Sequence, residues 1–265
     1  KPTYGLASTD GIVTLSWSMD HTGLMGSTSE DVAILMNALQ GVDPTDPGTL
    51  DLPDDDYTGY LFKDVKGFRV GLVVEALDGA DRETLRVFGE FVDALRSLGV
   101  EIVETKVPSA DDFRLCNNLG LIISRVEAAA YHTAFPDAGP KYITQVFEQL
   151  DEAAQVKAVD YINAQRYRSE FRERMLDELD GFDAFIMPTT LVPAVKSEDT
   201  EQYLTILSRN CIPWSMIGFP TLSAPAGLTS GGLPVGAQFV SAPFDDGIIL
   251  ALASALESVT EQQRP

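Results

Sequence analysis

Two hydrophobic periods alternate along the chain, one typical of strands and the other typical of helices. Residues 68–74 form an almost unbroken apolar run, which indicates a buried strand. Residues 81–98 place apolar side chains on one helical face, and Gly99 separates this helix from a second apolar run at 100–103. A helix between two buried strands is the usual crossover between parallel neighbours, so the pattern predicts two parallel strands in one sheet.

The same reasoning predicts the remaining elements. Helices are expected at 27–40, 111–134, 153–179 and 246–259. Strands are expected at 182–187, 221–224 and 236–240, and a short strand or extended segment at 11–15. A further element is expected at 205–217 and a polar loop at 43–58. Strands interleaved with helices indicate an α/β layered fold. No internal repeat or low-complexity linker divides the chain, so we expect one continuous domain over residues 1–265.

The charge balance narrows the range of partners. The chain carries 40 acidic and 19 basic residues, a net charge of −21, which argues against binding to a phosphate backbone. Such a surface suits either a cytoplasm with high salt or an ordinary acidic enzyme, and both interpretations stay open. No run of 18 apolar residues occurs, so we expect no membrane contact and a cytoplasmic location. Cys116 and Cys211 are far apart and are expected to be buried thiols.

Several common catalytic motifs are absent from the sequence. The only histidines are His21 and His132, and no G-x-S-x-G segment accompanies them, which excludes a standard Ser-His-Asp hydrolase. There is no P-loop, no G-x-G-x-x-G, no H-E-x-x-H and no paired C-x-x-C. The acidic triplet Asp54–Asp56 is expected to lie in a solvated loop rather than in a metal site, because no histidine or further carboxylate cluster flanks it. We therefore expect neither a metal nor a cofactor.

Three stretches, taken in order, resemble the amidase signature family. The first stretch contains K-P-T-Y-G at 1–5, S-x-D-x-x-G at 18–23 and the Glu30-Asp31 helix start. The second is D-x-x-x-x-P-T at 183–189. The third runs from 213 to 240 and contains G-x-P-x-x-S-x-P-x-G and G-L-P-V-G-x-Q. Any one stretch is a weak match, but their common order makes the resemblance specific. It implies a mixed β-sheet layered between helices, with residues 1–265 forming the C-terminal portion of a single domain that is incomplete at its N-terminal side.

The resemblance also implies a reaction. Members of this family hydrolyse the C–N bond of carboxamides with a Ser nucleophile, a second Ser preceded by a cis peptide bond, and a Lys, all of which lie upstream of the K-P-T-Y-G segment. It therefore assigns no catalytic residue to this chain, which is expected to be inactive alone. The implied partners are a small-molecule amide substrate and an N-terminal catalytic half in the same or a separate chain. A homodimer is left open.

Two other functions remain open. The chain could be a non-catalytic binding or scaffold module that kept the fold, or part of the A subunit of a tRNA-dependent glutamine amidotransferase. The net charge of −21 argues against direct RNA contact in the second case.

Candidate site residues follow from their position beyond strand ends, where α/β folds place ligand contacts. For the substrate pocket we single out Thr189, Thr190, Trp214, Ser215 and Ile217. The competing interpretations are core filling for Trp214 and a turn or helix cap for the two threonines.

A second group of candidates lies near the start of the chain. Tyr4, Ser18 and Asp20 would closely follow the upstream nucleophile loop, and we expect them to brace that loop by hydrogen bonds.

Three positions depart from the family pattern. Leu24 stands where Pro usually follows Gly, Ser27 stands where Arg usually precedes the helix start, and Ser215 stands where Asn usually follows the aromatic residue. Losing that Arg and that Asn removes hydrogen-bonding groups near the implied site. The departures therefore put the substrate class and the level of activity in question.

Overall fold

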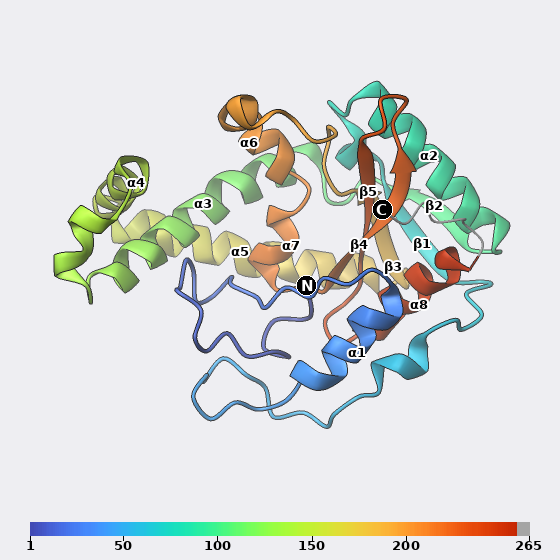
Figure 1. Cartoon of the computed structure of the whole chain (residues 1–265), viewed down its shortest axis with the longest axis horizontal. Helices are drawn as coiled ribbons and strands as arrows, with labels where there is room; N and C mark the ends of the chain where they lie inside the picture. Colours follow the sequence, from blue (N-terminus) through green and yellow to red (C-terminus); the bar gives the residue numbers. More distant parts are fainter. Residues whose placement is uncertain (259–265) are drawn as a thin grey trace.

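The computed structural model describes residues 1–258, which fold around one mixed β-sheet (Figure 1). Within these residues the sheet has five strands in the order β2-β1-β3-β5-β4. The strands are β1 (Arg69–Val73), β2 (Glu101–Thr105), β3 (Ala184–Pro188), β4 (Thr221–Leu228) and β5 (Pro234–Val240). β1 pairs in parallel with β2 and β3, whereas β5 pairs antiparallel with β3 and β4. The predicted α/β class, mixed sheet and parallel first pair are confirmed.

Both faces of the sheet are covered, and β3 shows why its sequence is apolar throughout. Every residue of β3 is buried. Ala184 and Ile186 pack into the cluster on one face, while Phe185 and Met187 pack into the cluster on the other. A strand buried on both faces needs an apolar side chain at every position, which explains the continuous apolar run.

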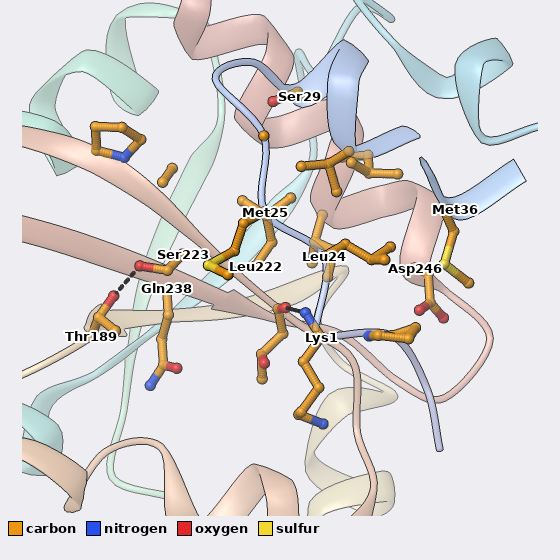
Figure 2. Close-up of a pocket in the computed structure, with 18 of the residues that line it drawn as sticks. Lys1, Leu24, Met25, Ser29, Met36, Thr189, Leu222, Ser223, Gln238 and Asp246 are labelled. Atoms are coloured by element: carbon orange, nitrogen blue, oxygen red, sulfur yellow. Dashed lines mark hydrogen bonds between the residues drawn. The ribbon is translucent and has the colours of Figure 1, made fainter. Parts of the chain in front are cut away.

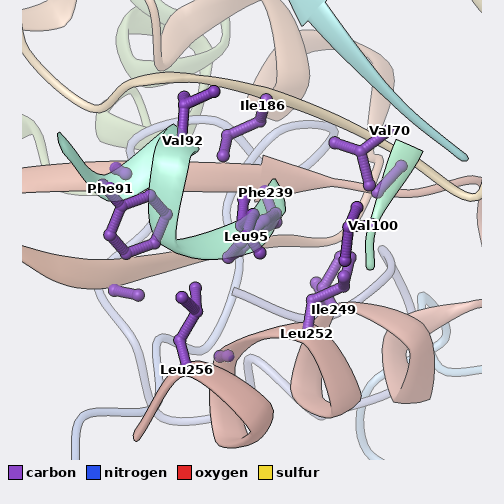
Figure 3. Packing of buried hydrophobic residues seen from close by; sticks show 14 of the residues in the cluster. Val70, Phe91, Val92, Leu95, Val100, Ile186, Phe239, Ile249, Leu252 and Leu256 are labelled. Atoms are coloured by element: carbon purple, nitrogen blue, oxygen red, sulfur yellow. The ribbon is translucent and has the colours of Figure 1, made fainter. Parts of the chain in front are cut away.

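The first face is covered by α2 (Arg82–Ser97) and α8 (Asp246–Glu257). Figure 3 shows Phe91, Val92 and Leu95 of α2 meeting Phe239 of β5, with Ile249, Leu252 and Leu256 of α8 closing the cluster. Phe239 is fully buried, and its ring lies 5.9 Å from that of Phe91. This cluster is the larger apolar core and fixes both helices to the sheet.

The second face is covered by α3 (Ala110–His132), α5 (Ala158–Leu179) and the short α7 (Ile212–Ile217). Trp214 is the largest side chain of this cluster, and it is fully buried, as are Phe113 and Phe171. The far ends of α3 and α5, together with α4 (Thr144–Ala154), extend away from the sheet as a helical arm (Figure 1).

The N-terminal region packs onto α8 and the sheet edge. After an irregular segment, α1 (Ser29–Leu39) begins at a capping box formed by Thr28 and Asp31. Ala33 and Met36 of α1 pack with Leu250 of α8. The short helices η1 (Tyr57–Tyr60), η2 (Val74–Leu77), η3 (Pro136–Lys141) and η4 (Ser197–Asp199) and the helix α6 (Thr200–Ser208) complete the description.

Several sequence-based boundaries need correction. The helix expected at 153–179 is divided by a turn at 155–157: residues 158–179 form α5, whereas 153–154 are the end of α4, most of which was not predicted. Both helices pack on α3. The element expected at 205–217 is likewise divided into the end of α6 and α7, because Pro213 can occupy only the first turn of a new helix.

Two further expectations concern the ends of the chain. Residues 11–15 form a turn and an irregular loop, so the strand alternative is wrong. The sequence pattern ends the final helix at Val259, which lies outside the described residues. None of the helices in the described part is long and apolar enough to cross a membrane.

Candidate functional site

A cavity of about 470 Å³ lies between the segment that precedes α1, the edge strand β4 and the first turns of α8 (Figure 2). This volume is in the range of small-molecule sites. Its walls come from parts of the chain that are far apart in sequence: Lys1 and Pro2, residues 24–29, Val32 and Met36, Thr189, Cys211 and Ser215, residues 221–225, Gln238, and Asp246, Ile249, Leu250 and Glu257.

One wall of the cavity is polar, and its side chains are hydrogen-bonded. Thr189, directly after β3, shares a 2.6 Å hydroxyl hydrogen bond with Ser223 of β4. Gln238 of β5 is 3% exposed, and its Nε2 donates to the Asn210 carbonyl oxygen at 2.6 Å. Because only the amide nitrogen can donate there, Gln238 Oε1 is fixed as an acceptor, and no hydrogen bond to another described residue occupies it.

The remaining lining of the cavity is largely apolar. Figure 2 shows Leu24, Met25, Met36 and Leu222 gathered on this side of the cavity. Met25 is 90% exposed, so this wall also forms the opening to solvent. The cavity therefore combines an apolar surface with a set of fixed hydrogen-bonding groups, which is the usual composition of a site for a small organic ligand.

The charged groups at the cavity are already engaged. Lys1 Nζ donates to the Phe219 carbonyl oxygen and lies 3.4 Å from His21 Nε2. Burial lowers the pKa of the Lys1 side chain to about 7, although the nearby Asp246 carboxylate opposes the shift. Burial, reinforced by the positive charge of Lys1, lowers the pKa of His21 to about 3. His21 is therefore neutral at pH 7.

Two carboxylates at the cavity have structural partners. Asp246 is 4% exposed and accepts hydrogen bonds from the backbone N–H and the hydroxyl of Thr3, at 2.8 and 2.6 Å. Glu257 accepts from the backbone N–H and hydroxyl of Ser29 at the start of α1. These contacts hold the N-terminal segments on α8. Within residues 1–258 no group of three or more metal-ligating side chains is assembled.

The predicted pocket residues separate into two sets. Thr189 and Ser215 line the cavity. Thr190 lies in a turn, where its hydroxyl donates to the Val192 carbonyl oxygen. Trp214 and Ile217 are buried in the core on the second face of the sheet, away from the cavity wall. α7 explains the difference, because residues of one helix point in different directions.

The three bracing candidates lie together around residues 15–20. The Tyr4 hydroxyl donates to the Trp17 carbonyl oxygen at 2.5 Å. Asp20 accepts from the backbone N–H groups of Leu15 and Ser16. Ser18 is bound on both sides, donating to Glu127 and accepting from Arg168.

Sequence reasoning missed several members of these sites. Ser223 and Gln238 are the fixed Ser and Gln of the third matched stretch, but the sequence analysis gave neither of them a role. Glu127 and Arg168 lie in helical sequence with an ordinary amphipathic pattern, more than 100 positions from Ser18. All three departures from the family pattern, at Leu24, Ser27 and Ser215, fall in the wall of this one cavity.

Comparison with known proteins identifies the family. Residues 1–250 match the family model for amidases. The chain is 31% identical over 271 residues to an amidase from Pseudomonas putida, and 31% identical over 296 residues to the A subunit of glutamyl-tRNA(Gln) amidotransferase from a Synechococcus strain. These alignments cover 98% and 100% of the chain but 57% of each relative, so the chain spans little more than half their length.

The fold comparison agrees. The crystal structure of the A subunit of glutamyl-tRNA(Gln) amidotransferase from Thermotoga maritima superposes with a TM-score of 0.85 at 25% identity, covering 98% of this chain and 57% of that one. The family match extends over nearly all the described elements and includes every wall of the cavity up to the first turn of α8. The chain therefore belongs to the amidase family.

Proposed function

We propose that this chain is the C-terminal part of an amidase that hydrolyses a carboxamide C–N bond, and that the cavity holds part of a small-molecule amide substrate. The observation that carries the proposal is the cavity itself, whose lining brings the apolar Leu24 and Leu222 together with hydrogen-bonded polar groups at Thr189, Ser223 and Gln238. Amidase family membership supports the reaction class.

The nucleophile and base of this reaction belong to an upstream half, which acts by a Ser–cisSer–Lys mechanism. An activated nucleophile needs a general base within hydrogen-bonding reach. Within the described residues, the hydroxyls of Thr189 and Ser223 hydrogen-bond to each other, with no lysine, histidine or carboxylate on either. Cys211 donates to the Thr189 carbonyl oxygen, and burial raises the pKa of its thiol to about 11. Thr189, Ser223 and Cys211 therefore lack an activating base, and we assign them to ligand binding rather than to nucleophilic attack.

The sheet edge offers a place for the upstream half. β4 is an edge strand, and its residue Thr221 exchanges two backbone hydrogen bonds with Lys1, at 2.9 and 3.0 Å. A reciprocal pair of this kind is the contact between opposed residues of antiparallel strands. A segment joined to Lys1 and continuing in this register would run beside Ser223. The upstream half would then complete the cavity at its polar wall.

The cavity walls suggest how substrate selection works. Gln238 Oε1 accepts an N–H group, so it favours a ligand that presents an amide or amine at the polar wall. Leu24, Met25 and Leu222 favour an uncharged apolar portion on the other side. With Ser27 and Ser215 in place of the usual Arg and Asn, these positions supply no cation for a substrate carboxylate. We infer a neutral amide with an apolar acyl or amine group.

A second candidate is the A subunit of a glutamyl-tRNA(Gln) amidotransferase, the name that several relatives at 29–31% identity carry. The cavity departures and the net charge of −21 count against it. A third candidate, a non-catalytic binding or scaffold module, predicts ligand binding without turnover.

The test compares the chain of 265 residues with the complete protein that includes an upstream half. Release of ammonia from primary amides and of arylamines from anilides is measured for each. We expect turnover by the complete protein and none by the chain alone. Turnover by the chain alone would show that its own residues are catalytic, and binding without turnover by the complete protein would favour the scaffold module. Glutamine-dependent amidation of glutamyl-tRNA would favour the second candidate.

The cavity is tested separately with two variants on β4. Ser223→Phe fills the polar side of the cavity, whereas Leu228→Phe changes a 42% exposed side chain of the same strand that lies outside the cavity. In the complete enzyme we expect a raised KM for Ser223→Phe and an unchanged KM for Leu228→Phe. Equal KM values for the two variants would move the substrate site elsewhere.

A further inference from the structure

A buried carboxylate connects the helical arm to the N-terminal segment. Glu127 lies in α3 and is 1% exposed. Among the described residues its two oxygens accept five hydrogen bonds: from Ser16 Oγ at 2.6 Å, Ser18 N at 3.1 Å, Ser18 Oγ at 2.7 Å, Tyr161 Oη at 2.8 Å and Gln165 Nε2 at 3.4 Å. Burying a carboxylate is costly unless such donors surround it, so this group is held in one geometry.

The donors come from two separate parts of the chain. Tyr161 and Gln165 belong to α5, whereas Ser16 and Ser18 belong to the irregular segment before α1. Arg168 of α5 holds Ser18 from its other side, with Nη1 donating to Ser18 Oγ at 2.8 Å and Nη2 donating to Ser18 O at 2.5 Å. Ser18 is thus held between a guanidinium and a carboxylate, both carried by helices.

The segment fixed in this way is itself compact. The Asp20 carboxylate accepts from Leu15 N and Ser16 N, both at 2.9 Å. Ser16 O accepts in turn from Met19 N at 2.8 Å and Asp20 N at 2.7 Å. Residues 15–20 therefore form one hydrogen-bonded turn, and moving Ser16 or Ser18 moves all of them.

This turn leads directly into the cavity wall. Leu24 is four residues beyond Asp20, and residues 24–29 line the cavity as far as the start of α1. Between them, His21 Nδ1 contacts Met19 O at 2.6 Å, and the other ring nitrogen faces Lys1 Nζ, which belongs to the cavity. A continuous series of contacts therefore joins Glu127 to one wall of the cavity, although Glu127 does not line it.

We propose that Glu127 is a positioning residue, which fixes the turn at 15–20 and thereby the cavity wall at 24–29 in the arrangement that binds substrate. The part of this proposal that concerns substrate rests on the proposed amidase function. The part that concerns the turn does not, and it is tested without catalysis.

The first test uses Glu127→Gln in the 265-residue chain. The variant keeps the shape of the side chain but replaces one acceptor oxygen with an NH₂ group, so the donors must compete for one oxygen. Asp112→Asn is the matched control: Asp112 is 6% exposed in the same helix, but its carboxylate binds Arg174, Tyr167 and Ser109 rather than the turn at 15–20.

Fluorine NMR of protein labelled with 5-fluorotryptophan reports on the turn. The chain has two tryptophans: Trp17, in the turn and 53% exposed, and Trp214, fully buried. Trp17→Phe assigns the two signals. In Glu127→Gln we expect the Trp17 signal to shift and narrow while the Trp214 signal stays in place. In Asp112→Asn we expect the Trp17 signal to be unchanged. An unchanged Trp17 signal in Glu127→Gln, or an equal shift in both variants, would overturn the proposal.

The second test measures steady-state kinetics of the complete enzyme. Because Glu127 acts through the cavity wall and touches no reacting atom, we expect Glu127→Gln to raise KM about tenfold, the effect of losing one hydrogen bond to a charged acceptor, with little change in kcat. Asp112→Asn should leave KM unchanged. A fall in kcat at constant KM, or equal kinetics for the two variants, overturns the positioning role. If the complete protein hydrolyses no amide but the Trp17 signal shifts as expected, the proposed function is contradicted. The positioning of the turn at 15–20 by Glu127 is then still supported.

Discussion

Gly236 of β5 occupies a position where a single added methyl group would disturb the polar wall of the cavity. A Cβ atom built on Gly236 lies 2.9 Å from both Ser223 Oγ and Thr189 Oγ1, and 3.3 Å from Thr189 Cβ. These two hydroxyls are the ones joined by the 2.6 Å hydrogen bond. In Gly236→Ala the hydroxyls must separate, because neither can stay at 2.9 Å from a carbon.

The expected loss of stability follows from the two effects of that separation. Overpacking a well-filled site costs about 1–3 kcal/mol, and a broken hydrogen bond costs about 0.5–1.5 kcal/mol. Ser223 is exposed, so its hydroxyl regains a hydrogen bond to water, and most of the second cost is recovered. We expect the free energy of unfolding to fall by about 1–3 kcal/mol, and the melting temperature by about 2–4 °C per kcal/mol for a chain of this size.

Urea and thermal unfolding followed by circular dichroism measure this loss, with Gly89→Ala as the control. Gly89 lies in the middle of α2, is exposed, and has no atom within 4 Å of an added Cβ. Its replacement should therefore stabilise the helix by about 1 kcal/mol. In the complete enzyme Gly236→Ala should also raise KM. A Gly236→Ala protein as stable as the wild type, with an unchanged KM, refutes both the crowded geometry and the assignment of this wall to substrate.

Three further predictions concern pH, thiol reactivity and salt. Burial raises the pKa of Asp112, but hydrogen bonds from Arg174, Ser109 and Tyr167 outweigh burial and lower the pKa to about 2. The stability that this carboxylate contributes is therefore present above its ordinary pKa of 3.8 and is lost as the pH falls toward 2. Acid unfolding of Asp112→Asn should lack this step. Because burial raises the pKa of Cys211 to about 11, iodoacetamide at pH 8 should modify it far more slowly in the native than in the urea-unfolded protein, and equal rates by mass spectrometry would contradict this. The chain has 40 acidic and 19 basic residues, and repulsion among the excess negative charges destabilises the fold at low salt. Raising KCl from about 0.1 to 1 M should therefore raise the melting temperature, and an unchanged melting temperature would contradict the salt-adapted interpretation.

The elements were largely predictable because burial imposes a period on the sequence. The apolar run of β3 and the amphipathic pattern of α2 each gave the right element to within two residues. The failures have a tertiary cause. The helix predicted at 153–179 starts too early, inside the turn before α5, and α4 was missed except for its last two residues. The packing of both helices on α3, which fixes that turn, is not visible in the sequence.

The site was less predictable than the fold. Position after a strand end led to the choice of Thr189, and the structure places both Thr189 and Ser215 of α7 in the cavity lining. The same reasoning selected Trp214 and Ile217, which turn inward, because a six-residue helix carries no clear sign of which side faces the core. Gln238 gained its significance only from the carbonyl of Asn210, which fixes the direction of its amide.

By itself, the sequence determined the α/β class, most of the strands and helices, and the family, because these depend on local periodicity and on short ordered motifs. Only the tertiary structure decided which residues share the cavity, where its polar and apolar walls lie, and that Glu127 holds Ser18 from 109 positions away. The physical reason is that a hydrogen bond acts over about 3 Å and depends on direction, whereas the sequence records only the order in which the groups occur.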